Sequence, residues 1–364
     1  MATSTNREQR EPLLRRVPSV LAAPPILVQP GVEKLGSPVI MEHDPVFPAP
    51  TFIQARFDAR KRRLPQCIAH RGYKAKFPEN TLAAFKGAVE AGTHALETDV
   101  HITKDDVVVI SHDATLERCF GREERILDCN WEDIKDARTL AEPHEPMPRL
   151  TDVLAYLAQP GLEDIWLLLD IKLINDAESI MRLIASTLAS APPSARKAWT
   201  DRVVLGIWAA KYLPLAQQHL PGYPVVHIGF STSYARHFFS VPNVGFGTLL
   251  PTLVAPGGKR FIRDARAQDR RVLAWTVNPA ERMEWCIRRG VDGVITDDPA
   301  MYLAVCEGYD EREGEAWMPL GWRGYVQCLR IWVWVSVLFL WRRRKFEPVA
   351  SRGLIRRKEV AEGM

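Results

Sequence analysis

Short apolar runs alternate with amphipathic segments between residues 65 and 310. Nine runs have the length and composition of strands: Cys67–His70, Leu96–Ile102, Val107–His112, Trp166–Ile171, Val203–Ile207, Val225–Phe230, Val244–Leu249, Val272–Val277 and Gly293–Thr296. Five segments have the spacing of amphipathic helices: Thr81–Ala91, Leu150–Leu157, Ala177–Leu188, Phe261–Gln268 and Ala280–Arg289. Repeated strand–helix units of this kind predict a parallel sheet in an α/β fold.

The length of this region favours a closed (β/α)₈ barrel, the TIM barrel, which typically takes ~250 residues. Several strands are almost continuously apolar, as expected when both faces are buried. Nine candidates are one too many for such a barrel, and we expect Val244–Leu249 to be a loop or an extra strand. A doubly wound open sheet would need a glycine-rich phosphate turn after its first strand. His70-Arg71-Gly72 is not such a turn, so the barrel is the preferred prediction.

Charge and proline content separate the ends of the chain from this body. Residues 1–64 contain nine prolines without sustained periodicity, and we expect them to be largely disordered. Residues 65–320 carry 28 basic and 35 acidic residues, whereas residues 321–364 carry 10 basic and 3 acidic ones. An acidic body argues against a nucleic-acid partner. The six cysteines have no C-x-x-C spacing, which argues against a zinc site or a disulfide framework.

The C-terminal region contains an aromatic, apolar run from Tyr325 to Trp341, followed at once by Arg342-Arg343-Arg344-Lys345. A spanning helix needs about 20 apolar residues, so this run is marginal. If the barrel is cytosolic, a spanning segment would also place the basic cluster on the far side, against the positive-inside tendency. A re-entrant or interfacial segment avoids that conflict, and a buried C-terminal element of the barrel is a further alternative.

We therefore expect residues 321–345 to bind an anionic membrane surface, with residues 346–364 as a basic tail. The predicted location is the cytosolic face of an intracellular membrane: endoplasmic reticulum, lipid droplet or mitochondrial.

Polar residues at the ends of the predicted strands are the candidate chemistry. Because the carboxyl ends of barrel strands converge on one mouth, we expect these side chains to meet there. The segments are His70-Arg71, Glu97-Thr98-Asp99, His112-Asp113, Asp170-Ile171-Lys172 and Trp275-Thr276-Val277-Asn278.

Glu97 and Asp99 are two positions apart, so their side chains point to the same face of a strand. Two adjacent carboxylates repel each other unless a positive charge lies between them, and a hard divalent cation with oxygen ligands would supply it. Asp170, at another strand end, would be a third ligand.

His70 and His112 are candidates for a general acid and a general base, because imidazole titrates near neutral pH. Arg71 and Lys172 would supply fixed positive charge for the oxygens of a phosphoryl group. Which histidine is the acid stays open.

Taken together, these motifs resemble the glycerophosphodiester phosphodiesterase family. The resemblance rests on Ile68-Ala69-His70-Arg71-Gly72, Pro78-Glu79-Asn80-Thr81, Glu97-Thr98-Asp99-Val100, Ile110-Ser111-His112-Asp113, Trp275-Thr276-Val277-Asn278 and Gly290-Val291-Asp292-Gly293-Val294-Ile295-Thr296-Asp297, in that order over roughly residues 67–305.

The resemblance implies a barrel that binds one divalent cation, Mg²⁺ or Ca²⁺. It implies catalytic roles for His70 and His112, phosphate contacts from Arg71 and Lys172, metal ligation by Glu97, Asp99 and Asp170, and supporting or pocket-lining roles for Glu79, Asn80, Asp113 and Trp275. Asp170 departs from the family, which usually has Glu-x-Lys at this strand. Aspartate reaches about one methylene less far, so direct metal contact stays open there.

The family's mechanism implies attack on phosphorus by a hydroxyl of the substrate's own glycerol, through a cyclic phosphate that water then opens. Phosphatidylglycerol keeps such a free hydroxyl on its headgroup, whereas choline and ethanolamine lipids do not. The overall pattern is similar to the fungal phosphatidylglycerol phospholipase C branch, which implies diacylglycerol and glycerol phosphate as products. A phosphodiesterase for soluble deacylated glycerophosphodiesters and an inactive membrane adaptor are the alternatives.

Overall fold

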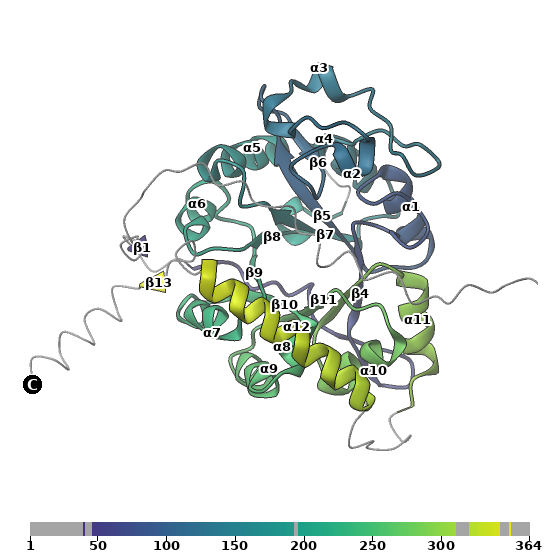
Figure 1. The fold of residues 1–364 in the computed structure, drawn as a ribbon, viewed down its shortest axis with the longest axis vertical. Coiled ribbons are helices and arrows are strands. Elements are labelled where there is room, and N and C mark those ends of the chain that lie inside the picture. Colours follow the sequence, from purple (N-terminus) through teal and green to yellow (C-terminus); the bar gives the residue numbers. More distant parts are fainter. Residues whose placement is uncertain (1–38, 41–45, 193–195, 311–319, 343–348, 351–364) are drawn as a thin grey trace, which may run out of the picture.

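The computed structural model describes residues 39–40, 46–192, 196–310, 320–342 and 349–350. Eight parallel strands close into a barrel, confirming the predicted fold (Figure 1). In barrel order they are β4 (Gln66–His70), β5 (Ala95–Ile102), β7 (Trp166–Ile171), β8 (Val203–Ile207), β9 (Val225–Gly229), β10 (Gly245–Leu249), β11 (Val272–Trp275) and β12 (Gly293–Thr296), and β12 pairs with β4 to close the ring.

Helices surround this ring, and most of them pack an apolar face on the strands. They are α1 (Leu82–Glu90), α2 (Glu117–Phe120), α3 (Trp131–Ile134), α4 (Leu150–Leu157), α5 (Ala177–Ser190), α6 (Tyr212–His219), α7 (Thr232–Ala235), α8 (Leu250–Val254), α9 (Gly258–Ala267), α10 (Ala280–Arg289) and α11 (Pro299–Gly308), with 3₁₀ turns at Ile126–Asp128, Trp199–Asp201 and Arg236–Ser240. Two further two-stranded pairings are β1 (Val39–Ile40) with β13 (Val349–Ala350) and β2 (Arg56–Phe57) with β3 (Arg63–Leu64).

The expectation that Val244–Leu249 is the surplus strand is wrong. It forms β10, which pairs in parallel with β9 and β11. The surplus strand is β6 (Val108–Ile110), which pairs antiparallel with the outer end of β5. Only five residues, 103–107, separate β5 from β6, and a parallel crossover needs about a dozen. His112 therefore follows an antiparallel return strand and not a barrel strand.

Residues 46–64 close the amino end of the barrel, so the segment that packs on the barrel extends to residues before the expected boundary at residue 65. Ile53 is fully buried in the core inside the barrel. The Gln66 side chain donates hydrogen bonds to the carbonyls of Phe52 and Gln54, both at 2.7 Å. The predictions for residues 1–38 and for the basic cluster at 343–345 lie outside the described residues.

The C-terminal run forms one long helix, α12 (Gly321–Arg342), which lies across the barrel (yellow in Figure 1) and packs on α8. Residues Gly321–Trp341 are long and apolar enough to cross a membrane, with a mean hydropathy of 1.4. Phe339 anchors the helix through ring contacts with Phe230 at 6.0 Å and Tyr234 at 5.9 Å.

Candidate active site

The inward-facing positions of the strands change from apolar to polar toward the carboxyl end of the barrel. Ile68 and Leu168 pack in the core inside the barrel. His70 and Asp170 follow two residues later on the same strands, and alternation places them on the same inward face. One period-two pattern therefore supplies both the core of the barrel and the polar mouth above it.

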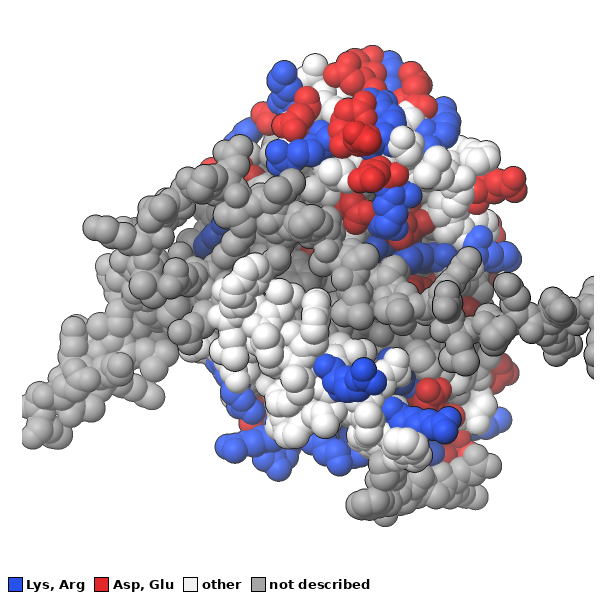
Figure 2. All heavy atoms as spheres, viewed as in Figure 1, with Lys and Arg blue, Asp and Glu red and all other residues white. Residues whose placement is uncertain are grey.

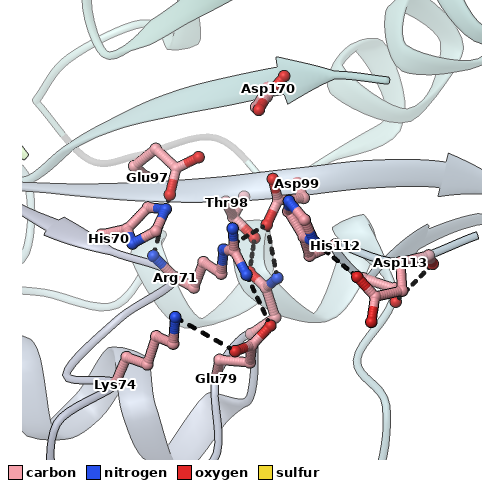
Figure 3. Close-up of polar contacts among 12 residues, drawn as sticks. His70, Arg71, Lys74, Glu79, Glu97, Thr98, Asp99, His112, Asp113 and Asp170 are labelled. Atoms are coloured by element: carbon pink, nitrogen blue, oxygen red, sulfur yellow. Dashed lines mark hydrogen bonds and ion pairs between the residues drawn. The ribbon is translucent and has the colours of Figure 1, made fainter. Parts of the chain in front are cut away.

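Three carboxylates, from Glu97, Asp99 and Asp170, form a cluster at this mouth (Figure 3). Each offers one oxygen within 4.8 Å of the other two, and all three side chains are buried. The strand register pairs Asp99 directly with Asp170 on the neighbouring strand. Asp170 therefore reaches the cluster although it is one methylene shorter than glutamate, and the Trp208 indole donates a hydrogen bond to its Oδ1 at 2.6 Å.

The electrostatics of the cluster fit a divalent cation. Burial, together with the charges of Asp99 and Asp170, raises the pKa of Glu97 well above its ordinary value. Burial also raises the pKa of Asp170, against the opposing effect of Lys172. Burial opposes ionisation of Asp99 too, but Lys172 and Arg71 outweigh it and hold that pKa well below its ordinary value. Oxygen-only ligands that need positive charge are the donor set of Mg²⁺ or Ca²⁺.

Lys172 lies against the acids. Its Nζ is 2.5 Å from Asp99 Oδ1 and 2.6 Å from Asp170 Oδ2. These two ion pairs raise the pKa of Lys172, although burial alone would lower it. Lys172 is therefore a permanent cation at the edge of the carboxylate cluster.

Each candidate histidine pairs with an aspartate through Nδ1. His70 Nδ1 lies 2.6 Å from Asp297 Oδ1, and His112 Nδ1 lies 2.7 Å from Asp113 Oδ1. With the proton on Nδ1, each ring donates to its carboxylate and keeps Nε2 available for substrate.

The pKa values of both histidines are depressed. Burial and the charge of Arg71 lower the pKa of His70, and burial and the charges of Lys172 and Arg71 lower the pKa of His112 to about 4. Near neutral pH both rings are therefore uncharged in the protein without substrate.

Arg71 lies between the two histidines in Figure 3. Its backbone is left-handed, with φ of 58°, and its N–H donates to Glu97 Oε2 at 2.9 Å. Its guanidinium donates to Glu79 Oε1 at 2.9 Å. Glu79 therefore fixes the guanidinium, whereas Glu97 fixes the backbone at Arg71.

The remaining predicted residues lie around this centre. Asn80 donates from Nδ2 to Asp99 Oδ2 at 2.8 Å. The Trp275 indole donates to the carbonyl of Gly247 at 2.9 Å, and Trp275 lines the same cavity as the histidines. The structure thus brings together all eleven residues predicted for the site.

Two further residues complete the network and were absent from the predicted set. Asp297 follows β12, so the strand-end rule that selected His70 would also have selected it. Arg118, from α2, donates to Asp113 Oδ2 at 2.6 Å and to both oxygens of Glu79. No local pattern marks Arg118, because its role depends on Glu79, which lies 39 residues earlier in the sequence.

Comparisons with known proteins agree with this site. The model of the Glycerophosphoryl diester phosphodiesterase family matches residues 70–301, which include every predicted site residue. A glycerophosphodiester phosphodiesterase of Caldanaerobacter subterraneus is 30% identical over 255 residues, covering 64% of this chain and 93% of that protein. The human lysophospholipase D is 45% identical over only 82 residues, 22% of this chain and 26% of that protein.

A solved phosphodiesterase of Oleispira antarctica, in complex with the product sn-glycerol-3-phosphate, shares the fold with a TM-score of 0.59. It is 22% identical, and the match covers 67% of this chain and 98% of that one.

Fold, site and matches together define a phosphoric diester hydrolase. The chain belongs to the glycerophosphoryl diester phosphodiesterase family. The relatives named here do not bear on the fungal phosphatidylglycerol branch, which stays a prediction.

Proposed function

We propose that this protein hydrolyses glycerophosphodiesters to glycerol 3-phosphate and an alcohol, with His70 and His112 as its proton-transfer residues. The observation that carries the proposal is the pair of aspartate-oriented histidines with Arg71 between them, next to three buried carboxylates. The soluble glycerophosphodiester is preferred as substrate because relatives matched over most of their length are glycerophosphodiester phosphodiesterases.

The proposed reaction begins when the phosphodiester anion binds against Arg71 and Lys172. Its negative charge offsets the two cations that depress the histidine pKa values, so one ring can be protonated while the other stays neutral. The neutral ring accepts the proton of the glycerol hydroxyl as that oxygen bonds to phosphorus. The charged ring donates a proton to the leaving alcohol oxygen, and a cyclic phosphate forms.

Water then opens the cyclic phosphate with the two rings in exchanged roles. Glu97, Asp99 and Asp170 would hold a divalent cation, which when bound stabilises negative charge on the phosphoryl oxygens.

A product assay tests this function. Purified protein with Mg²⁺ or Ca²⁺ should release glycerol 3-phosphate from glycerophosphocholine, and Asp99→Asn should abolish the release while the barrel stays folded by circular dichroism. Release of choline phosphate instead, or full activity of Asp99→Asn, would refute the assignment.

A second candidate function, hydrolysis of phosphatidylglycerol at a membrane, is favoured by α12. Several side chains on the outward face of its C-terminal half are apolar and exposed, among them Val337 at 61% and Leu340 at 60%. Figure 2 supports this, since an uncharged area lies where Figure 1 places the C-terminal half of α12, with basic side chains nearer its other end. An exposed apolar helix face next to the mouth suits a helix lying in the membrane interface, with the site turned toward lipid. We extend the proposal to the cytosolic face of an intracellular membrane.

Vesicle experiments separate the two candidates. Cosedimentation with vesicles containing phosphatidylglycerol should fall at least about ten-fold for the double variant Val333→Asp, Val337→Asp, because a charge is costly in the interface. Equal rates of hydrolysis of phosphatidylcholine and phosphatidylglycerol in those vesicles would exclude a selectivity for phosphatidylglycerol. Faster hydrolysis of glycerophosphocholine than of either lipid would leave the soluble diester as the substrate.

A further inference from the structure

The cavity that contains the candidate active site is polar only on one side. His70, Arg71, Glu97, His112, Asp170 and Lys172 line that side. Trp208, Ile228, Phe230, Leu249 and Trp275 continue the lining as an apolar wall from the barrel. A phosphate group and a glycerol moiety need the polar side alone, so the apolar wall requires a different occupant.

Helix α12 supplies the rest of the apolar wall. Ile331, Trp334, Val335 and Leu338 line the cavity, and their spacing of three, four and seven residues places them on one helical face. Val335 is buried, and Trp334 is half-exposed beside it. Helix α12 therefore contributes four apolar side chains to the cavity, and the polar residues of the cavity come entirely from other elements.

The opposite face of α12 is separate from this wall. Leu329, Val333, Val337 and Leu340 lie there at the same helical spacing, and each is 45–61% exposed. Because different residues form the two faces, the inner face can be substituted without changing the outer one.

The position of the inner face is fixed by packing. Phe339 contacts Phe230 of the cavity wall, and Cys328 is fully buried near Cys286 of α10. The Arg282 guanidinium donates a hydrogen bond to Gln327 Oε1 at 2.5 Å. These contacts hold α12 against the barrel along two of its turns, so its inner face is a built part of the cavity.

We propose that the inner face of α12 and the facing barrel wall bind an acyl chain attached to the substrate's glycerol, next to the phosphodiester at the polar side. This inference rests on the proposed function and adds that Ile331 and Leu338 determine specificity. An acyl-bearing glycerophosphodiester could be a lysophospholipid or phosphatidylglycerol, and both place an aliphatic chain within reach of the same wall. The chain leaves water on binding, and that burial favours acylated over deacylated diesters.

Steady-state kinetics with substrates below their aggregation threshold test the proposal without a membrane. The ratio of kcat/KM for hexanoyl-lysophosphatidylglycerol to kcat/KM for glycerophosphoglycerol measures the benefit of the chain. Ile331→Asn with Leu338→Asn should lower this ratio about ten-fold or more, because polar side chains weaken burial of the chain. The matched outer variant, Val333→Asn with Val337→Asn, should leave it within about two-fold.

Ile331→Trp gives an independent check, since it keeps the wall apolar but narrows the cavity. It should also lower the ratio, and circular dichroism with thermal unfolding should give a native barrel for each variant. An unchanged ratio in both inner variants, or an equal fall in the outer variant, would overturn the proposal. If wild-type protein hydrolyses neither substrate, the proposed function itself fails; if it hydrolyses both with no benefit from the chain, only the acyl site fails.

The same inner variants distinguish the two lipid sources. In vesicles, a lower rate on phosphatidylglycerol with unchanged vesicle binding would assign the wall to a bilayer lipid. A lower rate only on the dispersed lysophospholipid would assign it to the single-chain substrate.

Discussion

At the residue scale, the aspartate partners of the two histidines leave the Nε2 atom of each ring available for substrate. His70 pairs with Asp297 and His112 with Asp113, and both pairs use Nδ1. Strand-end patterning predicted both histidines and all three carboxylates of the cluster. It could not predict Arg118, because that side chain links nearby Asp113 to Glu79, which lies 39 residues earlier in the sequence.

Replacing the partner of His70 should shift the pH dependence of the reaction. Burial and Arg71 lower the pKa of His70, and Asp297 counteracts them. Asp297→Asn removes a charge that favours the imidazolium, so the pKa should fall further and the corresponding limb of the pH–rate profile should move to lower pH. We expect a loss of about 10- to 100-fold in kcat, by analogy with other side chains that orient a histidine. An unshifted profile would show that Asp297 does not act through His70.

Asp170 should be required for tight cation binding, despite its shorter side chain. Removing its charge while keeping its shape, Asp170→Asn, should lower the affinity for Mg²⁺ or Ca²⁺ by about 10- to 100-fold, because one of three anionic ligands is lost. Asp170→Glu restores the residue usual in the family and should retain binding. Calorimetric titration measures both affinities, and wild-type affinity of Asp170→Asn would exclude Asp170 from the ligand set.

At the scale of elements, the prediction failed where loop length mattered more than composition. Val107–His112 has a strand composition, but the short loop before it permits only a hairpin with β5. This return strand brings His112 back level with Asp99, since the Ser111 N–H donates to the Asp99 carbonyl at 3.1 Å. The glycines in Val244–Leu249 lowered its apparent strand propensity, although β10 lies fully buried between two barrel strands.

The segment before β4 was expected to be disordered because of its prolines, yet Phe47 is fully buried in the main core. Phe47→Ala should therefore lower the free energy of unfolding by about 3–5 kcal/mol, through lost burial and a new cavity. Phe57 in the same segment is 71% exposed, so Phe57→Ala should change the free energy of unfolding by less than about 0.5 kcal/mol. Urea unfolding measures the free energy of unfolding of both variants, and equal losses would contradict the burial of Phe47 in the core.

At the scale of the whole molecule, the sequence predicted an acidic body and an apolar C-terminal segment but not how they meet. Charged residues cover much of the surface in Figure 2 away from the C-terminal half of α12, which presents an uncharged area. The docking of α12 on the barrel depends on contacts such as Phe339 with Phe230, more than 100 residues apart. Hydropathy alone could not distinguish a spanning segment from a helix that forms part of the mouth.

The central claim is that His70 and His112 move protons for a hydroxyl that the substrate itself provides. The most direct test compares glycerophosphocholine with its 2-deoxy analogue, which lacks the hydroxyl next to the phosphoester, for the wild-type protein with its cation. We predict that the analogue binds as a competitive inhibitor but is turned over at least about a thousand-fold more slowly, because no internal nucleophile is available. Hydrolysis of the analogue at the rate of glycerophosphocholine would contradict the account.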